Sequence, residues 1–217
     1  MTTMTTTGVN PGTRLTGVLL LISFVAMVAG AAIVAPSGLT LNPADPVAAL
    51  TAVHDNVGLH MTELALDVIG WLALTAAGLL IAMHGHLAVL AGGLLAASGL
   101  AGLLHDAGNL AVTRLAADPS GGSADVAALA LLTAKWGVNL AGLLWVAATV
   151  ATVGLSAPRW FRSAGVVAAA SGFVAVVLPW TTGTAGISPE LEQLGYALHL
   201  PVMLWYAALG WRYLCER

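Results

Sequence analysis

The residues best suited to chemistry stand at the start of a long apolar stretch, where His60, Glu63, Asp67 and Trp71 follow one another at helical spacing. At about 100° per residue, these side chains fall within a stripe of roughly 60° on one helix face. The remaining faces of the stretch carry mainly Leu, Ala and Val. A polar stripe that enters a bilayer has to face other helices or a wet cavity, so we expect a functional site here.

Polar residues recur at a similar depth in three other apolar stretches. At about 1.5 Å per residue, these polar groups lie about 20–30 Å from the cytoplasmic end of each helix. They therefore share one layer in the outer half of a hydrocarbon core about 30 Å thick. The layer contains Glu63, Asp67, His105, Asp106, Lys135, Asn139 and His199. We expect a polar chamber between the helices that carry them, open toward the extracytoplasmic side.

Composition places the whole chain in the membrane. Of its 217 residues 59% are hydrophobic and 8% are charged, against about 25% charged residues in soluble domains. The net charge of −3 leaves no basic surface for nucleic acid. The single cysteine, Cys215, excludes an internal disulfide and a thiolate metal cluster.

The pattern predicts an all-α fold, an integral membrane bundle of six transmembrane helices. Residues 1–13 are expected to be a disordered tail and residues 14–217 a single domain. The expected helices cover residues 15–35, 49–83, 87–116, 125–155, 163–180 and 189–214. Basic residues at helix ends set the orientation: Arg14, Arg159, Arg162, Arg212 and Arg217 on one side, Arg114 on the other. We therefore expect a multi-pass protein of the cell membrane with both termini in the cytoplasm.

The leading interpretation is an intramembrane enzyme that needs no cofactor and takes an apolar substrate from the lipid bilayer. A carboxyl group in a poorly hydrated pocket stays protonated at neutral pH and can protonate an alkene or epoxide. Asp67 is the candidate acid, Glu63 would tune it, and His105 or His199 would take the final proton. Asp106 completes the catalytic set and is expected to pair with Lys135, since a free ammonium would repel a carbocation. The remaining residues expected to contact substrate are His60, Trp71, Asn109, Lys135, Trp136, Asn139 and Tyr206. Cyclisation or isomerisation of an isoprenoid is the most concrete form of this chemistry.

Two other functions fit the same residues. Three imidazoles, from His60, His105 and His199, plus water would make the zinc site of a membrane hydrolase, with Asp106 or Glu63 as the base; a b-type haem between two of these histidines is a variant. A proton-coupled carrier of small molecules would use the same buried carboxyl groups and Lys135.

The overall layout resembles a family of small six-helix bacterial membrane proteins of unknown function. The resemblance rests on Arg14-Leu-Thr-Gly-Val-Leu-Leu-Leu-Ile, on Pro158-Arg-Trp-Phe-Arg and on Glu63-x-x-x-Asp67. It implies the six-helix fold and no particular activity. In size and in its acidic residue within a helical pocket, the chain is also similar to small integral-membrane terpene cyclases, which implies an isoprenoid substrate.

Overall fold

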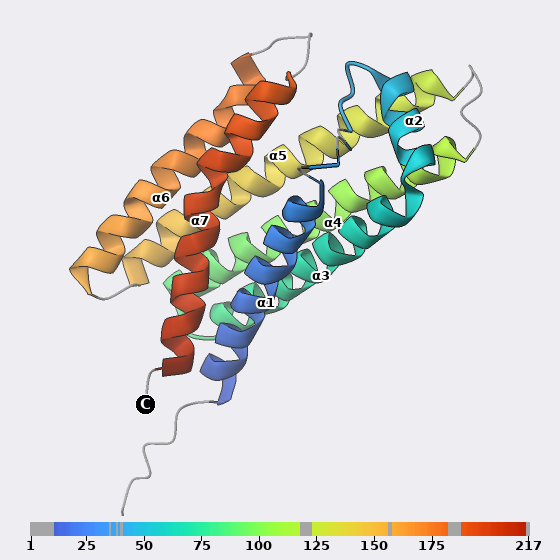
Figure 1. Cartoon of the computed structure of the whole chain (residues 1–217). Coiled ribbons are helices and arrows are strands. Elements are labelled where there is room, and N and C mark those ends of the chain that lie inside the picture. The colour runs from blue at the N-terminus through green and yellow to red at the C-terminus, as the bar shows by residue number, and fades with distance from the viewer. Residues whose placement is uncertain are drawn as a thin grey trace, which may run out of the picture.

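The computed structural model describes residues 11–34, 36–37, 39, 41–117, 123–155, 158–181 and 188–215. Within these ranges the chain forms helices and no strand, and the helices lie together in one elongated bundle (Figure 1). The helices are α1 (Pro11–Val34), α2 (Pro46–Asp55), α3 (Val57–Ala82), α4 (His86–Ala116), α5 (Ala124–Leu155), α6 (Arg159–Val177), the 3-10 helix η1 (Leu178–Thr181) and α7 (Pro189–Cys215).

The all-α prediction is confirmed, and five helices are long and apolar enough to cross a membrane: α1, α3, α4, α5, and α6 together with η1. The sixth expected span, α7, has 27 residues but is not among these five helices. Helix α1 begins at Pro11, inside the tail expected to be disordered. Residues 1–10 of that tail, the loop at 118–122 and Arg217 lie outside the described residues.

The single helix expected at 49–83 is wrong, because the chain breaks at Asn56 into α2 and α3. Asp45 caps α2 by accepting a hydrogen bond from the Ala48 N–H (2.9 Å), and Pro46 occupies the first helical position. At the other end the Asn56 backbone leaves the helical region, with φ −129°, and its side chain donates to the Ala52 carbonyl (3.1 Å). Helix α2 then buries its apolar side, including Leu50, against the ends of α4 and α5.

The helices are arranged so that α3 packs on α4, α4 on α5 and α5 on α6, while α7 lies between α1 and α6 (Figure 1). The start of α1 and the end of α7 lie together at the end opposite α2, where Gly17 and Gly210 bring the two backbones into close contact. We call these the α2 end and the terminal end. The main core contains Trp71, Trp145 and Tyr206.

Small residues set the register between the antiparallel helices α3 and α4. A Cβ atom at Gly78 would lie 2.7 Å from the Gly92 carbonyl oxygen, and one at Gly99 would lie 2.8 Å from the Trp71 carbonyl oxygen. One turn further along α4, Gly102 accommodates the Trp71 ring. Close backbone approach through small residues is how helices pack where no hydrophobic effect drives them together. Continued by another turn on each helix, the same register places position 67 opposite position 106.

Candidate functional site

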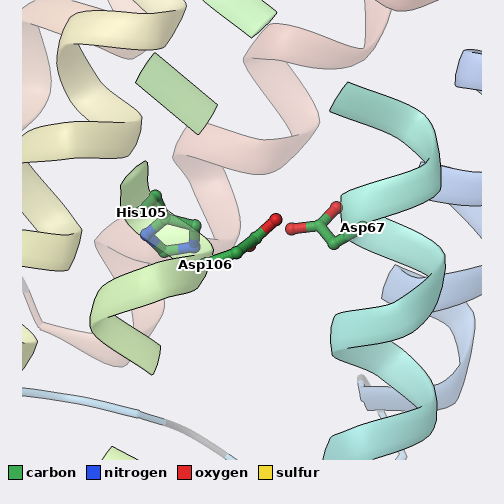
Figure 2. A group of neighbouring side chains, drawn as sticks. All are labelled: Asp67, His105 and Asp106. Atoms are coloured by element: carbon green, nitrogen blue, oxygen red, sulfur yellow. The ribbon is translucent and has the colours of Figure 1, made fainter. Parts of the chain in front are cut away.

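Two carboxyl groups face each other across the α3–α4 contact (Figure 2). Asp67 and Asp106 each place an oxygen within 4.8 Å of the other and of a ring nitrogen of His105. Asp106 is only 2% exposed, and neither of its oxygens has a hydrogen-bond partner in the part of the chain that the structure describes. Two carboxyl groups this close in an apolar interior do not both ionise. The arrangement is therefore that of an acid and a carboxylate that share one proton, which we call the acid pair.

His105 is held as a neutral imidazole by its two neighbours. Its Nδ1 lies 2.8 Å from the Ala134 carbonyl oxygen of α5, and its Nε2 lies 3.0 Å from the Asn109 amide nitrogen. A carbonyl only accepts and an amide nitrogen only donates, so Nδ1 carries the proton and Nε2 accepts. Both ring nitrogens are thus engaged, and His105 has no lone pair free for a metal or for a proton from substrate.

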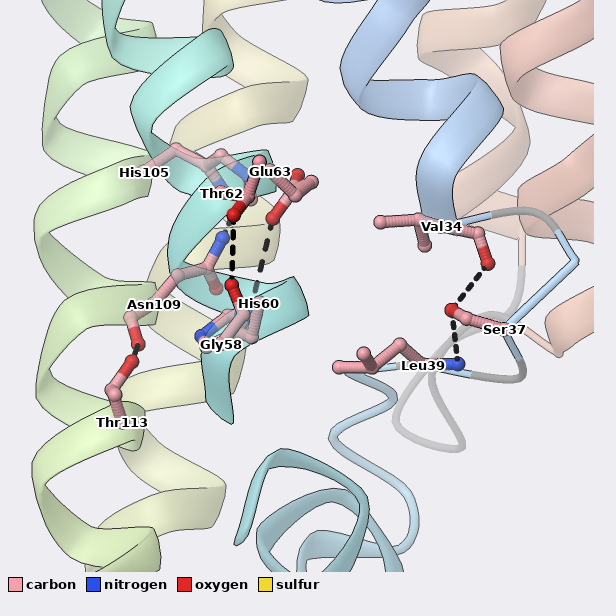
Figure 3. Close-up of polar contacts among 10 residues, drawn as sticks. All are labelled: Val34, Ser37, Leu39, Gly58, His60, Thr62, Glu63, His105, Asn109 and Thr113. Atoms are coloured by element: carbon pink, nitrogen blue, oxygen red, sulfur yellow. Dashed lines mark hydrogen bonds and ion pairs between the residues drawn. The ribbon is translucent and has the colours of Figure 1, made fainter. Parts of the chain in front are cut away.

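Further polar side chains of α3 and α4 lie near the acid pair, and Figure 3 shows His60 and Glu63 of α3 beside His105 and Asn109 of α4. Glu63 lies one turn before Asp67, and its Oε2 is 3.8 Å from the Nδ1 of His60. His60 is 1% exposed and its Nε2 has no hydrogen-bond partner among the described residues. Figure 3 shows Asn109 of α4 beside this group. The stripe predicted on α3 therefore faces the polar side of α4, as expected.

Lys135 forms an ion pair with Glu192 of α7, and the expected pair with Asp106 is wrong. The reason lies in the rotation of α4, because successive residues point about 100° apart on a helix. His105 points to α5, where Lys135 stands, and so Asp106 points to α3. The Lys135 and Glu192 side chains are 18% and 11% exposed, and the Tyr196 hydroxyl donates a further hydrogen bond to Glu192 (2.8 Å).

Several other predicted site residues serve mainly to join helices. Asn139 donates to the Val176 carbonyl (2.9 Å) and accepts from the Trp180 indole N–H (3.0 Å), which ties α5 to α6 and η1. The Trp136 ring packs edge-on against Trp180, with centroids 5.0 Å apart. The Tyr206 hydroxyl lies 3.3 Å from the Thr152 hydroxyl, deep in the core. These contacts are sufficient to explain why the three residues are polar or aromatic.

Trp71 and His199 line the core below the acid pair. The Trp71 ring lies 5.7 Å from the Trp145 ring, centroid to centroid, and His199 contacts the other side of Trp145 at 5.3 Å. The indole N–H groups of both tryptophans are buried without a hydrogen-bond partner in the described structure. Trp71 is one turn from Asp67 on the same face, as the spacing predicts.

The three histidines expected to hold zinc do not come together. Among the described residues, the group with metal-ligand spacing is Asp67, His105 and Asp106. His60 and His199 are not part of it. A cation at this group would have to break the hydrogen bond from His105 to Ala134 or the one from Asn109 to His105. A shared proton satisfies the two carboxyl groups without breaking either bond.

Glu192 and Tyr196 are site residues that the sequence analysis did not assign. Glu192 stands seven residues before His199, so the two share a helix face. That spacing, together with a lysine in helix α5 that needs a partner, is the signal that could have found Glu192. Nothing in the sequence pattern singles out Tyr196.

Compared with protein-family models, with curated proteins and with solved structures, the chain matches none of them.

Proposed function

We propose that this chain is an intramembrane acid–base enzyme that isomerises or cyclises an apolar, isoprenoid-like substrate. The observation that supports this is the acid pair: two carboxyl groups, from α3 and α4, face each other and form no ion pair with a basic side chain among the described residues. Such a pair retains a proton in surroundings that exclude water, and it can deliver that proton to a carbon–carbon double bond or an epoxide.

The reaction returns the proton that it uses. Asp67 donates its proton to one carbon of the substrate, which leaves a carbocation on the neighbouring carbon. Trp71, one turn away, offers an aromatic face to this cation. The substrate then loses a proton from an adjacent carbon to the acid pair, where Asp106 is the available carboxylate because both nitrogens of His105 are engaged. The product is an isomer, and the pair again holds one proton.

A lipid-soluble carbodiimide tests the acid pair directly, because such reagents add to protonated carboxyl groups in apolar surroundings. We expect peptide mass analysis to find the adduct on Asp67 or Asp106, and less of it as the pH rises. Asp67→Asn should abolish the activity and any adduct at position 67 while the protein stays folded. The matched control is Asp125→Asn, which changes an exposed aspartate in the first turn of α5. No adduct at either position, at any pH, would contradict the proposal.

Activity is assayed by comparing the lipid extracts of cells that carry the native gene, the Asp67→Asn variant or no gene. New or missing lipid-like products that depend on Asp67 would support an enzyme. A second candidate, a proton-coupled carrier, is favoured by the further polar side chains that lie near the acid pair, Glu63 and His60 of α3. Uptake of protons into proteoliposomes that depends on Asp67, with unchanged lipid extracts, would favour this carrier.

We also propose that α7 crosses the membrane as a sixth span and that both termini are cytoplasmic. Its 27 residues exceed the ~20 that a bilayer needs, and it runs along α1 and α6. In a Cys215→Ser background, a cysteine at the exposed position Asp55 should react with an impermeant thiol reagent on intact cells. A cysteine at Trp160, which is 67% exposed at the other end of the bundle, should not react. The reverse pattern would place the termini outside.

A further inference from the structure

The two halves of α7 are packed very differently. Residues 202–210 bury Val202, Trp205, Tyr206 and Leu209 in the core, and the Trp205 indole N–H donates to the Phe161 carbonyl (3.0 Å). Residues 190–198, by contrast, include no buried residue, and His199, beside the boundary, contacts the core at Trp145 (5.3 Å between ring centroids). The neighbouring end of α6 does bury side chains over the same depth. The second half of α7 is therefore anchored, and the first half rests on the bundle without entering its core.

Pro201 stands at the boundary between these halves. Proline has no N–H, so the Ala197 carbonyl loses its usual hydrogen bond within the helix. Ser171 of α6 donates instead to the next carbonyl, that of Leu198 (2.7 Å). A helix bends most easily where its own hydrogen bonds are missing. The end of the core contacts and the weak point of the helix thus coincide.

Beyond that point, the first half of α7 is held to α5 by the ion pair between Glu192 and Lys135. The backbones of α5 and α7 approach each other at few points, whereas α7 follows α1 and α6 closely. A Cβ atom added at Gly195 would meet nothing within 4 Å. Tyr196, which donates to Glu192, is 56% exposed. Lys135, which holds this segment, follows Ala134, whose carbonyl oxygen accepts from His105, the neighbour of Asp106 in α4. The loosely packed segment therefore lies close to the acid pair.

We infer that residues 190–198 are a gate close to the acid pair, latched by Lys135 and Glu192, and that apolar substrate reaches the site between α5 and α7. The identity of the substrate that passes this gate rests on the proposed function. The gate itself follows from the packing: breaking the ion pair removes the polar contact that holds this segment to α5, and Pro201 lets it swing without disturbing the core.

Distances between spin labels test the gate in the full-length protein. In a Cys215→Ser background, one pair of labels is placed at Gln193 and Leu129, exposed positions on the α2-end halves of α7 and α5. A control pair is placed at Leu204 and Val150, exposed positions on the terminal-end halves of the same helices. Pulsed electron resonance in nanodiscs then gives the distance distribution of each pair.

We expect Lys135→Met and Glu192→Gln to add a longer distance at the first pair and to leave the control pair unchanged. Glu192→Gln keeps the size and hydrogen-bonding capacity of the side chain, so it serves if Lys135→Met fails to fold. The charge swap, Lys135→Glu with Glu192→Lys, should restore the native distribution. An unchanged first pair in both single variants would overturn the gate, and so would a change at both pairs, because that would mean general loosening of α7.

Carbodiimide labelling separates this outcome from the proposed function. If the gate is correct, the single variants should raise the labelling rate of the acid pair several-fold, and Pro201→Ala, which restores the backbone hydrogen bond, should lower it. Unchanged distances with normal labelling would reject the gate and keep the acid pair. Lengthened distances with no labelling in any variant would reject the acid chemistry and keep the gate.

Discussion

Two adjacent glycines of α4 provide a stringent test of the structure, because an alanine at each should have opposite effects. Gly92 faces α3, where an added Cβ would lie 2.9 Å from the Ala82 Cα and closer still to the Ala82 nitrogen and the Gly78 carbonyl oxygen. Cβ atoms essentially never approach below 3.0 Å, and all three obstacles are backbone atoms that no side-chain rotation can move. Gly93 is exposed, and an added Cβ there would meet nothing within 4 Å.

The expected magnitudes follow from these contacts. Gly92→Ala overpacks a helix interface and forces α3 and α4 apart, which should destabilise the fold by about 1–3 kcal/mol. Gly93→Ala only removes backbone freedom from the unfolded chain, which should stabilise the fold by about 0.5–1 kcal/mol. The two variants should therefore differ by about 1.5–4 kcal/mol, although they differ in sequence only by the position of one methyl group.

Reversible unfolding in mixed micelles, titrated with a denaturing detergent and followed by circular dichroism, measures the difference. Gly92→Ala should unfold at a lower detergent fraction than the native protein, and Gly93→Ala at an equal or higher one. If the two variants unfold together, the α3–α4 register is wrong. The juxtaposition of Asp67 and Asp106, which follows from that register, would then lose its support.

Three further substitutions test the polar contacts, each by the same unfolding measurement. Lys135→Met leaves Glu192 as a largely buried charge and should destabilise the fold by about 3–5 kcal/mol. The double variant, Lys135→Met with Glu192→Gln, should lose less stability. Equal losses in the single and double variants would mean that the ion pair is not formed. Asn139→Ala removes the hydrogen bonds that tie α5 to α6 and η1 and should cost about 1–3 kcal/mol, whereas no loss would mean that those ties are absent. Asp106→Asn gives Asp67 an amide donor and should leave stability unchanged or raise it; a loss as large as that of Lys135→Met would indicate that Asp106 has a basic partner.

The sequence predicted correctly some of the features that depend on a single helix. The polar stripe on α3 and the polar side of α4 follow from spacing along the chain, and the structure brings them together. The break at Asn56 was not predicted from periodicity, although the polar run His54-Asp55-Asn56 stands there. What divides α2 from α3 is the capping by Asp45 and the non-helical backbone at Asn56, and hydrophobicity reports neither feature.

The partner of Asp106 could not be predicted by considering one helix at a time. Depth along the bundle placed Asp106 and Lys135 in one layer, but depth alone does not select which residues pair. The choice of partner depends on the rotation of α4 about its own axis, and a step of one residue rotates the side chain by about 100°. The glycines at 92, 99 and 102 fix that rotation, because only the face that carries them can approach α3 closely. The information was thus in the sequence, but in the small residues and not in the charged ones.

Charge within the bundle supplies the final argument for a bound proton. Glu63, Asp67, Asp106 and Glu192 lie close together, and Lys135, paired with Glu192, is their basic neighbour. With every group ionised, the surplus of negative charge would lie inside a layer of low dielectric, where even one unpaired charge is costly. His105 cannot offset it, because its two hydrogen bonds fix it as a neutral ring. The surplus is relieved when the acid pair holds a proton, and a proton held in this way can be given to a substrate without first being drawn from water.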